Sequence, residues 1–186
     1  GEKFEKSEVV HYDKRHIKEI LVADVEGDGK QELYASVEAQ MGEGFKVEVP
    51  VDIVRFDYKD GKFEPTQVAS LPGERFCRFL TAGDIDHDGK PELVAAAFST
   101  GVWVIEKNDK DYDAQVIDKD TGGFEHAAYM ADMNGDGKVE LYVADDNHGA
   151  FKQYSYDGSK YVSKVIGKRL EPRAAMVWNI TVADLP

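Results

Sequence analysis

Short apolar runs, in several of which polar residues alternate with apolar ones, make up most of this chain of 186 residues. The runs are about five to eight residues long and rich in Val, Tyr and Phe, which is typical of β-strands. Segments rich in Gly and Asp separate them, and two of these, 59–61 and 156–159, have the composition of tight turns. No window keeps a period of 3.6 residues for three turns, the sign of a helix. The pattern predicts an all-β fold.

One acidic nonamer occurs three times, at residues 24–32, 84–92 and 132–140. The copies begin 60 and then 48 residues apart. Each copy lies between the first and second of four consecutive strand-like runs, which we name strands A to D. A single four-stranded sheet cannot bury both of its faces. Repeats of this length are typical of β-propeller blades, which bury their faces by stacking around an axis.

We expect the whole chain to form one propeller segment. Three blades are too few to close a ring, because propellers usually have about four to eight. The chain is therefore expected to be a segment of a larger propeller, or part of an oligomeric ring completed by other copies. The expected parts are the D strand of a preceding blade at 1–13, three complete blades at 16–72, 76–120 and 124–168, and the A strand of a following blade at 174–186.

The nonamer has the chemistry of a calcium loop. Side-chain oxygens at positions 1, 3, 5 and 9 point to one centre, Gly at position 6 permits a sharp bend, and position 7 offers its backbone carbonyl. Acidic side chains this close repel one another, a cost that a bound cation removes. The predicted Ca²⁺ ligands are Asp24, Glu26, Asp28, the Lys30 carbonyl and Glu32; Asp84, Asp86, Asp88, the Lys90 carbonyl and Glu92; and Asp132, Asn134, Asp136, the Lys138 carbonyl and Glu140.

An EF-hand shares the first six positions of this loop. It also requires flanking helices and a bidentate Glu at position 12, where this chain has Ala35, Ala95 and Val143. The sequence therefore disfavours an EF-hand. It predicts three Ca²⁺ sites with a structural role, in which the ion joins strand A to strand B.

The three copies resemble FG-GAP/VCBS repeats, the calcium-loop blades of integrin α-subunit propellers and of many secreted bacterial proteins. The resemblance covers nearly the whole chain, and its Asp-x-[Asp/Asn]-x-Asp-Gly-x-x-[Asp/Glu] loop recurs at blade spacing. Glu26 departs from the usual Asp or Asn at position 3, and its longer side chain leaves less room for an ion in the first loop. Calcium loops of this kind work at the millimolar Ca²⁺ found outside the cytoplasm. We therefore expect an extracellular, periplasmic or cell-surface location.

The charge balance narrows the range of partners. The chain has 36 acidic and 23 basic residues, a formal net charge of −13, which disfavours nucleic acid and anionic membrane surfaces. No apolar run approaches the roughly 18 residues of a membrane-spanning helix. Cys77 is the only cysteine, so no intrachain disulfide can form.

Ligand-binding candidates are expected on the face opposite the calcium loops, where the D–A and B–C connections lie. We count six residues back from the first Asp of each loop, and from Asp184 in the A strand expected at 174–186. Each count gives one position near the start of an innermost strand. These positions are expected to surround the mouth of the central channel. With one residue from a D–A connection and one from a B–C connection, the candidates are Lys18, Arg78, His126, Trp178, Arg75 and His148.

No catalytic motif accompanies these residues: the chain has no Gly-x-Ser-x-Gly, His-Glu-x-x-His, phosphate-binding or dinucleotide-binding pattern. The sequence therefore favours a non-catalytic recognition or adhesion module for a glycan or protein ligand, and no catalytic residue is predicted. The alternative is the propeller portion of a polysaccharide-acting enzyme such as a lyase. In that case His126, with Tyr129 or Arg78, would supply the base and neutralise charge.

Overall fold

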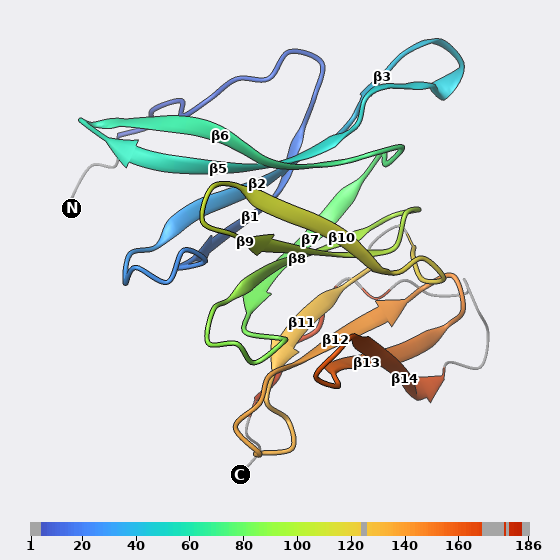
Figure 1. The fold of residues 1–186 in the computed structure, drawn as a ribbon. Helices are drawn as coiled ribbons and strands as arrows, with labels where there is room; N and C mark the ends of the chain where they lie inside the picture. Colours follow the sequence, from blue (N-terminus) through green and yellow to red (C-terminus); the bar gives the residue numbers. More distant parts are fainter. Residues whose placement is uncertain (1–4, 124–125, 169–176, 178, 184–186) are drawn as a thin grey trace.

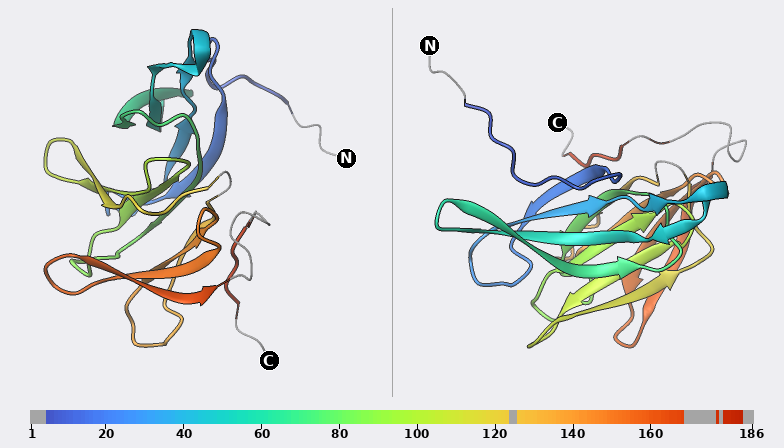
Figure 2. Two further views of the ribbon diagram at one scale, coloured as in Figure 1. Left: turned by 90° about the vertical axis from the view of Figure 1, so that its right-hand side faces the viewer. Right: turned by 90° about the horizontal axis from the view of Figure 1, so that it is seen from above.

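The computed structural model describes residues 5–123, 126–168, 177 and 179–183. Three antiparallel four-stranded sheets make up most of this part of the chain, and each contains one predicted blade. Figure 1 shows them stacked in chain order, and Figure 2 shows the same order from two other sides. The sheets consist of β1 (Ile17–Ala23), β2 (Glu32–Val37), β5 (Val51–Lys59) and β6 (Lys62–Leu71); β7 (Cys77–Gly83), β8 (Glu92–Ala97), β9 (Val102–Lys107) and β10 (Tyr112–Asp118); and β11 (Ala128–Ala131), β12 (Glu140–Asp145), β13 (Ala150–Tyr156) and β14 (Tyr161–Lys168).

The strand order confirms the predicted blades. Within each sheet, the four strands pair in chain order, with strand A at one edge and strand D at the other. β7 lies beside both β1 and β11, so the A strands are neighbours (Figure 1). The three acidic nonamers connect β1 to β2, β7 to β8 and β11 to β12. This arrangement is that of three blades of a partial β-propeller.

A small hairpin in the first blade was not predicted. It consists of β3 (Gln40–Met41), the 3₁₀ turn η1 (Glu43–Phe45) and β4 (Val47–Val49), inserted between β2 and β5. Figure 1 shows it at the upper right, away from the β1–β2 and β7–β8 loops at the left. The B–C connection of the first blade is thus an ordered extension on the face opposite the acidic loops.

The two terminal strands differ from the prediction. Residues 5–13 contain no strand, although the sequence pattern placed a D strand at 1–13. Val10 and Tyr12 nevertheless pack against the apolar group formed by Ala35, Val37 and Phe56 with Val54. Apolar packing thus holds these two side chains although residues 5–13 form no strand. Of the A strand expected at 174–186, residues 177 and 179–183 contain no strand, and the rest lies outside the described residues.

Apolar side chains between adjacent sheets form the core. Tyr34 and Ile53 of the first sheet share one cluster with Leu80 and Leu93 of the second. A second cluster joins Val94, Ala96 and Val104 to Leu141, Val143 and Tyr154. No helix in the described residues is long and apolar enough to cross a membrane.

Equivalent positions on the A strands show which faces are covered. Leu80 and Ala128, each four residues before the first Asp of its loop, are both 5% exposed and lie between sheets. Ile20, at the same repeat position in β1, is 63% exposed, and Val22 two residues later is 56% exposed. In the second and third sheets, these positions therefore contact the preceding sheet. In the first sheet, the same positions are apolar and exposed.

Alanine substitutions at two equivalent positions test this difference. We expect Leu80→Ala to lower the free energy of unfolding by about 2–5 kcal/mol, because it opens a cavity between two sheets. Ile20→Ala, on the open edge, is expected to change it by only about 0.5 kcal/mol. Urea unfolding followed by circular dichroism measures both. Equal losses would contradict an open first sheet.

Candidate functional site

The three acidic loops share one backbone framework. The N–H at position 6 donates to the carboxylate at position 1, from Gly29 to Asp24 at 2.8 Å and from Gly89 to Asp84 at 3.1 Å. Gly137 makes the same bond at 2.8 Å in the third loop. The glycines at position 6 have φ between 83° and 92°, a region that other residues rarely adopt. The sequence pattern therefore predicts the turn because it specifies both the acceptor and the glycine.

The second loop brings its acids closest together. One carboxylate oxygen from each of Asp84, Asp86, Asp88 and Glu92 lies within 4.8 Å of the others. Glu92 is 1% exposed and accepts a hydrogen bond from the Ile85 N–H at 3.0 Å. Asp84 Oδ1 is buried and has no hydrogen-bond partner in the described structure. Four converging carboxylates, one of which has a buried oxygen without a hydrogen-bond partner, form a donor set that fits a hard cation such as Ca²⁺.

Electrostatic repulsion accompanies this convergence. Burial and, more weakly, the neighbouring Asp86, Asp84 and Asp88 raise the pKa of Glu92 to about 8, despite the hydrogen bond from Ile85. The Glu92 carboxyl is thus unfavourable as an anion in this cluster when no cation is present.

The first loop gathers only three of its four acids. Asp24, Asp28 and Glu32 lie within 4.8 Å of one another. Glu26, at position 3, instead forms an ion pair with Arg55 of β5, and the Tyr112 hydroxyl of the second blade lies 3.4 Å from it. The prediction that Glu26 is a ligand in the same cluster does not match this geometry, because its longer side chain reaches Arg55 rather than the loop centre.

The third loop is held by hydrogen bonds between its own side chains. Asn134 Nδ2 donates to Glu140 at 2.9 Å, and the Tyr142 hydroxyl donates to the same carboxylate at 3.0 Å. In the described part of the chain, groups of three or more His, Cys, Asp or Glu side chains converge only in the first two loops. An ion in the third loop would have to displace the contact between Asn134 and Glu140.

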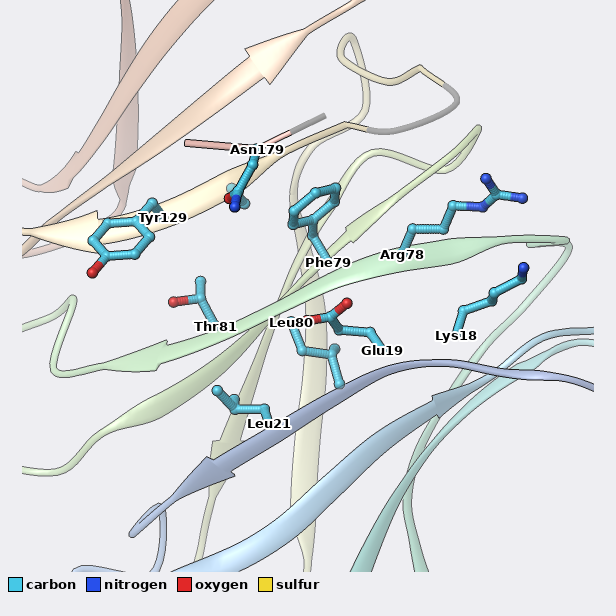
Figure 3. A pocket seen from close by; sticks show the side chains of 10 residues that line it. Lys18, Glu19, Leu21, Arg78, Phe79, Leu80, Thr81, Tyr129 and Asn179 are labelled. Carbon is cyan, nitrogen blue, oxygen red and sulfur yellow. The ribbon is translucent and has the colours of Figure 1, made fainter. Parts of the chain in front are cut away.

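A pocket of about 560 Å³ lies along the three A strands, away from these loops. Lys18 and Arg78, both predicted ligand-binding residues, line it together (Figure 3). Thr81 and Tyr129, three residues before the first Asp of their loops, line it as well, as does Asn179. Counting back three residues instead of six would have predicted Thr81 and Tyr129 from the sequence. Counting back from the loops does not predict Asn179, which lies five residues before Asp184.

The repeats of the first two blades have a recognised family. Residues 24–95 match the family model described as FG-GAP-like repeat, a span that includes the first two acidic loops. These residues thus contain the FG-GAP-like repeat. With three four-stranded sheets in blade order, the chain forms a β-propeller segment.

Among solved structures, the chain is similar to an Agrocybe aegerita lectin whose structure concerns recognition of non-reducing terminal N-acetylglucosamine. The two are 15% identical, with a TM-score of 0.46, and the match covers 84% of this chain and 53% of the lectin chain. The matched region thus spans about half the length of that lectin chain. No curated protein sequence gives a significant match.

His126 does not lie at the predicted channel mouth. Its ring is 1% exposed, with Nδ1 2.7 Å from the Ala97 carbonyl and Nε2 3.1 Å from the Thr121 hydroxyl. β11 begins only at Ala128, and the φ of 34° at His126 marks an irregular backbone before the strand. His126 lies as many residues before its acidic loop as Lys18 and Arg78 do before theirs, but the backbone around His126 has a different conformation.

Two further candidates, Arg75 and His148, lie apart from the pocket. The Arg75 guanidinium lies over the rings of Phe76 and Phe98, at 6.0 and 5.4 Å from their centroids. His148 Nδ1 lies 2.8 Å from Asp145 Oδ2. Trp178 lies outside the described residues. Of the five predicted ligand-binding residues that the structure describes, Lys18 and Arg78 alone line this pocket.

The burial of His126 predicts a specific pH dependence. Burial lowers the pKa of His126 below its usual value, so the folded chain keeps this ring neutral. The unfolded chain binds a proton near pH 6.5, and the free energy of unfolding therefore falls below that pH, by up to about 1.4 kcal/mol one pH unit lower.

His126→Asn is the matched variant for this measurement. Asn retains a donor for the Ala97 carbonyl and tolerates positive φ, but it does not titrate. We expect the wild type to lose more stability than His126→Asn between about pH 7.5 and 5.5 in urea unfolding. Parallel curves would contradict the neutral, buried imidazole.

Proposed function

We propose that this chain is part of a calcium-binding β-propeller that recognises a glycan or a protein ligand without catalysing a reaction. The observation that carries the calcium proposal is the second loop, where four carboxylates converge and one of them, Asp84, has a buried oxygen without a hydrogen-bond partner. The donor set consists entirely of hard oxygens, which Ca²⁺ prefers.

The ion's role in this proposal is structural. Asp84 directly follows β7 and Glu92 begins β8, so a cation between them would join strand A to strand B. Ile85, whose N–H donates to Glu92, is fully buried between the second and third sheets. Ca²⁺ would therefore hold the loop that inserts Ile85 into the core, and bound ion would stabilise the folded chain by mass action.

The three loops are expected to bind Ca²⁺ with different affinity. The second loop contributes four carboxylates and the first three, because Glu26 pairs with Arg55. The third loop must first break the hydrogen bond from Asn134 to Glu140. We therefore rank the second site tightest, since more preorganised charged oxygens increase affinity.

Ligand recognition is assigned to the face opposite the acidic loops. Lys18 and Arg78 line a pocket there. The catalytic alternative required His126 as a base at this surface, and the buried ring hydrogen-bonded to the Ala97 carbonyl does not support it. A setting outside the cytoplasm, where such loops encounter roughly millimolar Ca²⁺, follows from the calcium proposal.

Further blades complete the propeller in this account. Ile20 and Val22 are exposed at one end of the stack. At the other end, Met133 is 59% exposed, although Val25 and Ile85 at the same repeat position are buried between sheets. Neighbouring blades from the same parent chain, or from other copies of this chain, would cover these positions.

Glu92→Gln tests the second calcium site. In chelator, we expect this variant to melt no lower than the wild type, because the Gln amide is neutral without taking up a proton, whereas burial and the neighbouring acids disfavour the ionised Glu92 carboxyl. Added Ca²⁺ should stabilise the wild type more, the second site alone contributing about 2.7 kcal/mol at 100 times its dissociation constant. Scanning calorimetry with and without Ca²⁺ measures both effects.

Asp60→Asn is the control for this experiment, since it removes an acid from the β5–β6 turn, where Asp60 has a φ of 50° that Asn tolerates. Its response to Ca²⁺ should match that of the wild type. An unchanged response in Glu92→Gln would contradict the assignment of the second site.

Glu26→Asp tests the explanation for the first loop. The shorter side chain cannot reach Arg55 as Glu26 does and matches Asp86, the equivalent residue of the second loop. We expect it to raise the Ca²⁺ affinity of the first loop about tenfold, which is about 1.4 kcal/mol. Calorimetric titration in a Glu92→Gln background isolates this loop, and a lower affinity would contradict the explanation.

A further inference from the structure

The pocket along the A strands has a charged end and a neutral end. Lys18 and Arg78 extend toward the same side in Figure 3, whereas Thr81, Tyr129 and Asn179 lie at the opposite end. Its volume of about 560 Å³ is within the range of roughly 300–1,000 Å³ typical of small-molecule sites. Two basic side chains thus line one pocket, although the chain as a whole has a net charge of −13.

The same backbone irregularity positions both cations. In the first sheet, Ile17 pairs with Val37 and Glu19 with Ser36, so Lys18 is the extra residue of a β-bulge. In the second sheet, the pairing shifts in the same way around Arg78, between Cys77 and Phe79. Bulges redirect side chains and are frequent beside functional sites. Two repeats thus present a cation at equivalent places on neighbouring strands.

Two acids lie near the cations of the pocket, Glu38 beside Arg78 and Glu19 in the pocket lining. The Nε atom of Arg78 lies 3.5 Å from Glu38 Oε1, and its guanidinium lies 5.7 Å from the Phe76 ring centroid. Glu38 is 5% exposed and lies outside the pocket lining. Glu19 lines the pocket between the two ends, and burial raises the pKa of its carboxyl. Lys18 is exposed to solvent.

The neutral end offers groups that suit a sugar ring. Thr81 and Asn179 supply a hydroxyl and an amide, which both donate and accept hydrogen bonds. Tyr129 supplies an aromatic face and a hydroxyl and is 37% exposed. A pyranose ring with hydroxyls and one apolar face matches such a lining, and a carboxylate on that ring would match the charged end.

We propose that this pocket binds an acidic saccharide, with its carboxylate between Lys18 and Arg78 and its sugar ring against Tyr129. The proposal rests on the recognition part of the proposed function and specifies its ligand class. It does not depend on the acidic loops, because none of their residues lines the pocket.

Methyl β-glucuronide and methyl β-glucoside are matched probes, because they differ only in the carboxylate. We expect the glucuronide to bind the complete chain in a titration followed by ¹H–¹⁵N NMR, with the largest shifts in β1, β7 and β11. The glucoside should bind at least about tenfold more weakly, since it lacks the charge-assisted hydrogen bonds. Raising the salt concentration should weaken only the glucuronide.

Variants distinguish the contribution of Lys18 and Arg78 to binding from that of general surface charge. Lys18→Gln and Arg78→Gln should each weaken glucuronide binding about tenfold, and Arg78→Lys should retain part of it. Lys62→Gln, which removes an exposed cation at the start of β6, should leave the affinity unchanged. Binding unaffected by the Lys18 and Arg78 variants would overturn the proposal.

Three further outcomes would overturn it. Equal binding of glucoside and glucuronide would remove the carboxylate from recognition. Tighter binding of a hexaglutamate peptide would make the ligand an acidic peptide instead. Absence of glucuronide binding at millimolar concentration would exclude the pocket as a saccharide site. If Ca²⁺ still stabilises the same samples in calorimetry, the calcium part of the proposed function stands despite any of these results.

Discussion

Buried carboxylates at the junction of strands A and B are the constraint on which this structure depends. Glu32, Glu92 and Glu140 each begin a B strand and are at most 9% exposed. An ionised carboxylate in such surroundings is unfavourable unless hydrogen bonds or a cation compensate it. The second and third loops differ in this respect. Asn134 and Tyr142 donate hydrogen bonds to Glu140 in the third, whereas in the second Glu92 accepts one from the Ile85 N–H and lies among converging acids, where we propose a cation.

This junction also links the loops to the packing between sheets. Val25 and Ile85, each one residue after the first Asp of its loop, are buried in successive inter-sheet clusters. A loop that changes shape would therefore move a core side chain. The A strand itself continues to the opposite face, where bulges at Lys18 and Arg78 direct cations to the pocket. One strand thus connects the acidic face to the pocket.

The repeat pattern predicted the three sheets because strand type, spacing and turn chemistry all agreed. It also predicted the loop framework, since Asp at position 1 and Gly at position 6 specify the same turn in each copy. His87 shows how strong that constraint is: it adopts a φ of 64° where the other two loops have glycine.

Position counting failed where the local backbone differs between repeats. His126 has the spacing of Lys18 and Arg78, but β11 starts later than β1 and β7, and its ring turns into the core. Glu26 has the spacing of Asp86, but a partner from another strand, Arg55, captures it. The repeat pattern predicts neither the contact of His126 with the Ala97 carbonyl nor that of Glu26 with Arg55, because each partner is distant in sequence.

A crystal structure of the chain grown with Ca²⁺ tests the central claim most directly. The account predicts an ion in the second loop, bound by oxygens of Asp84, Asp86, Asp88 and Glu92 at about 2.3–2.6 Å. Asp84 Oδ1, unsatisfied in the present structure, should be among those ligands. An ordered second loop without a bound cation, its carboxylates instead contacting water or lysine side chains, would contradict the account.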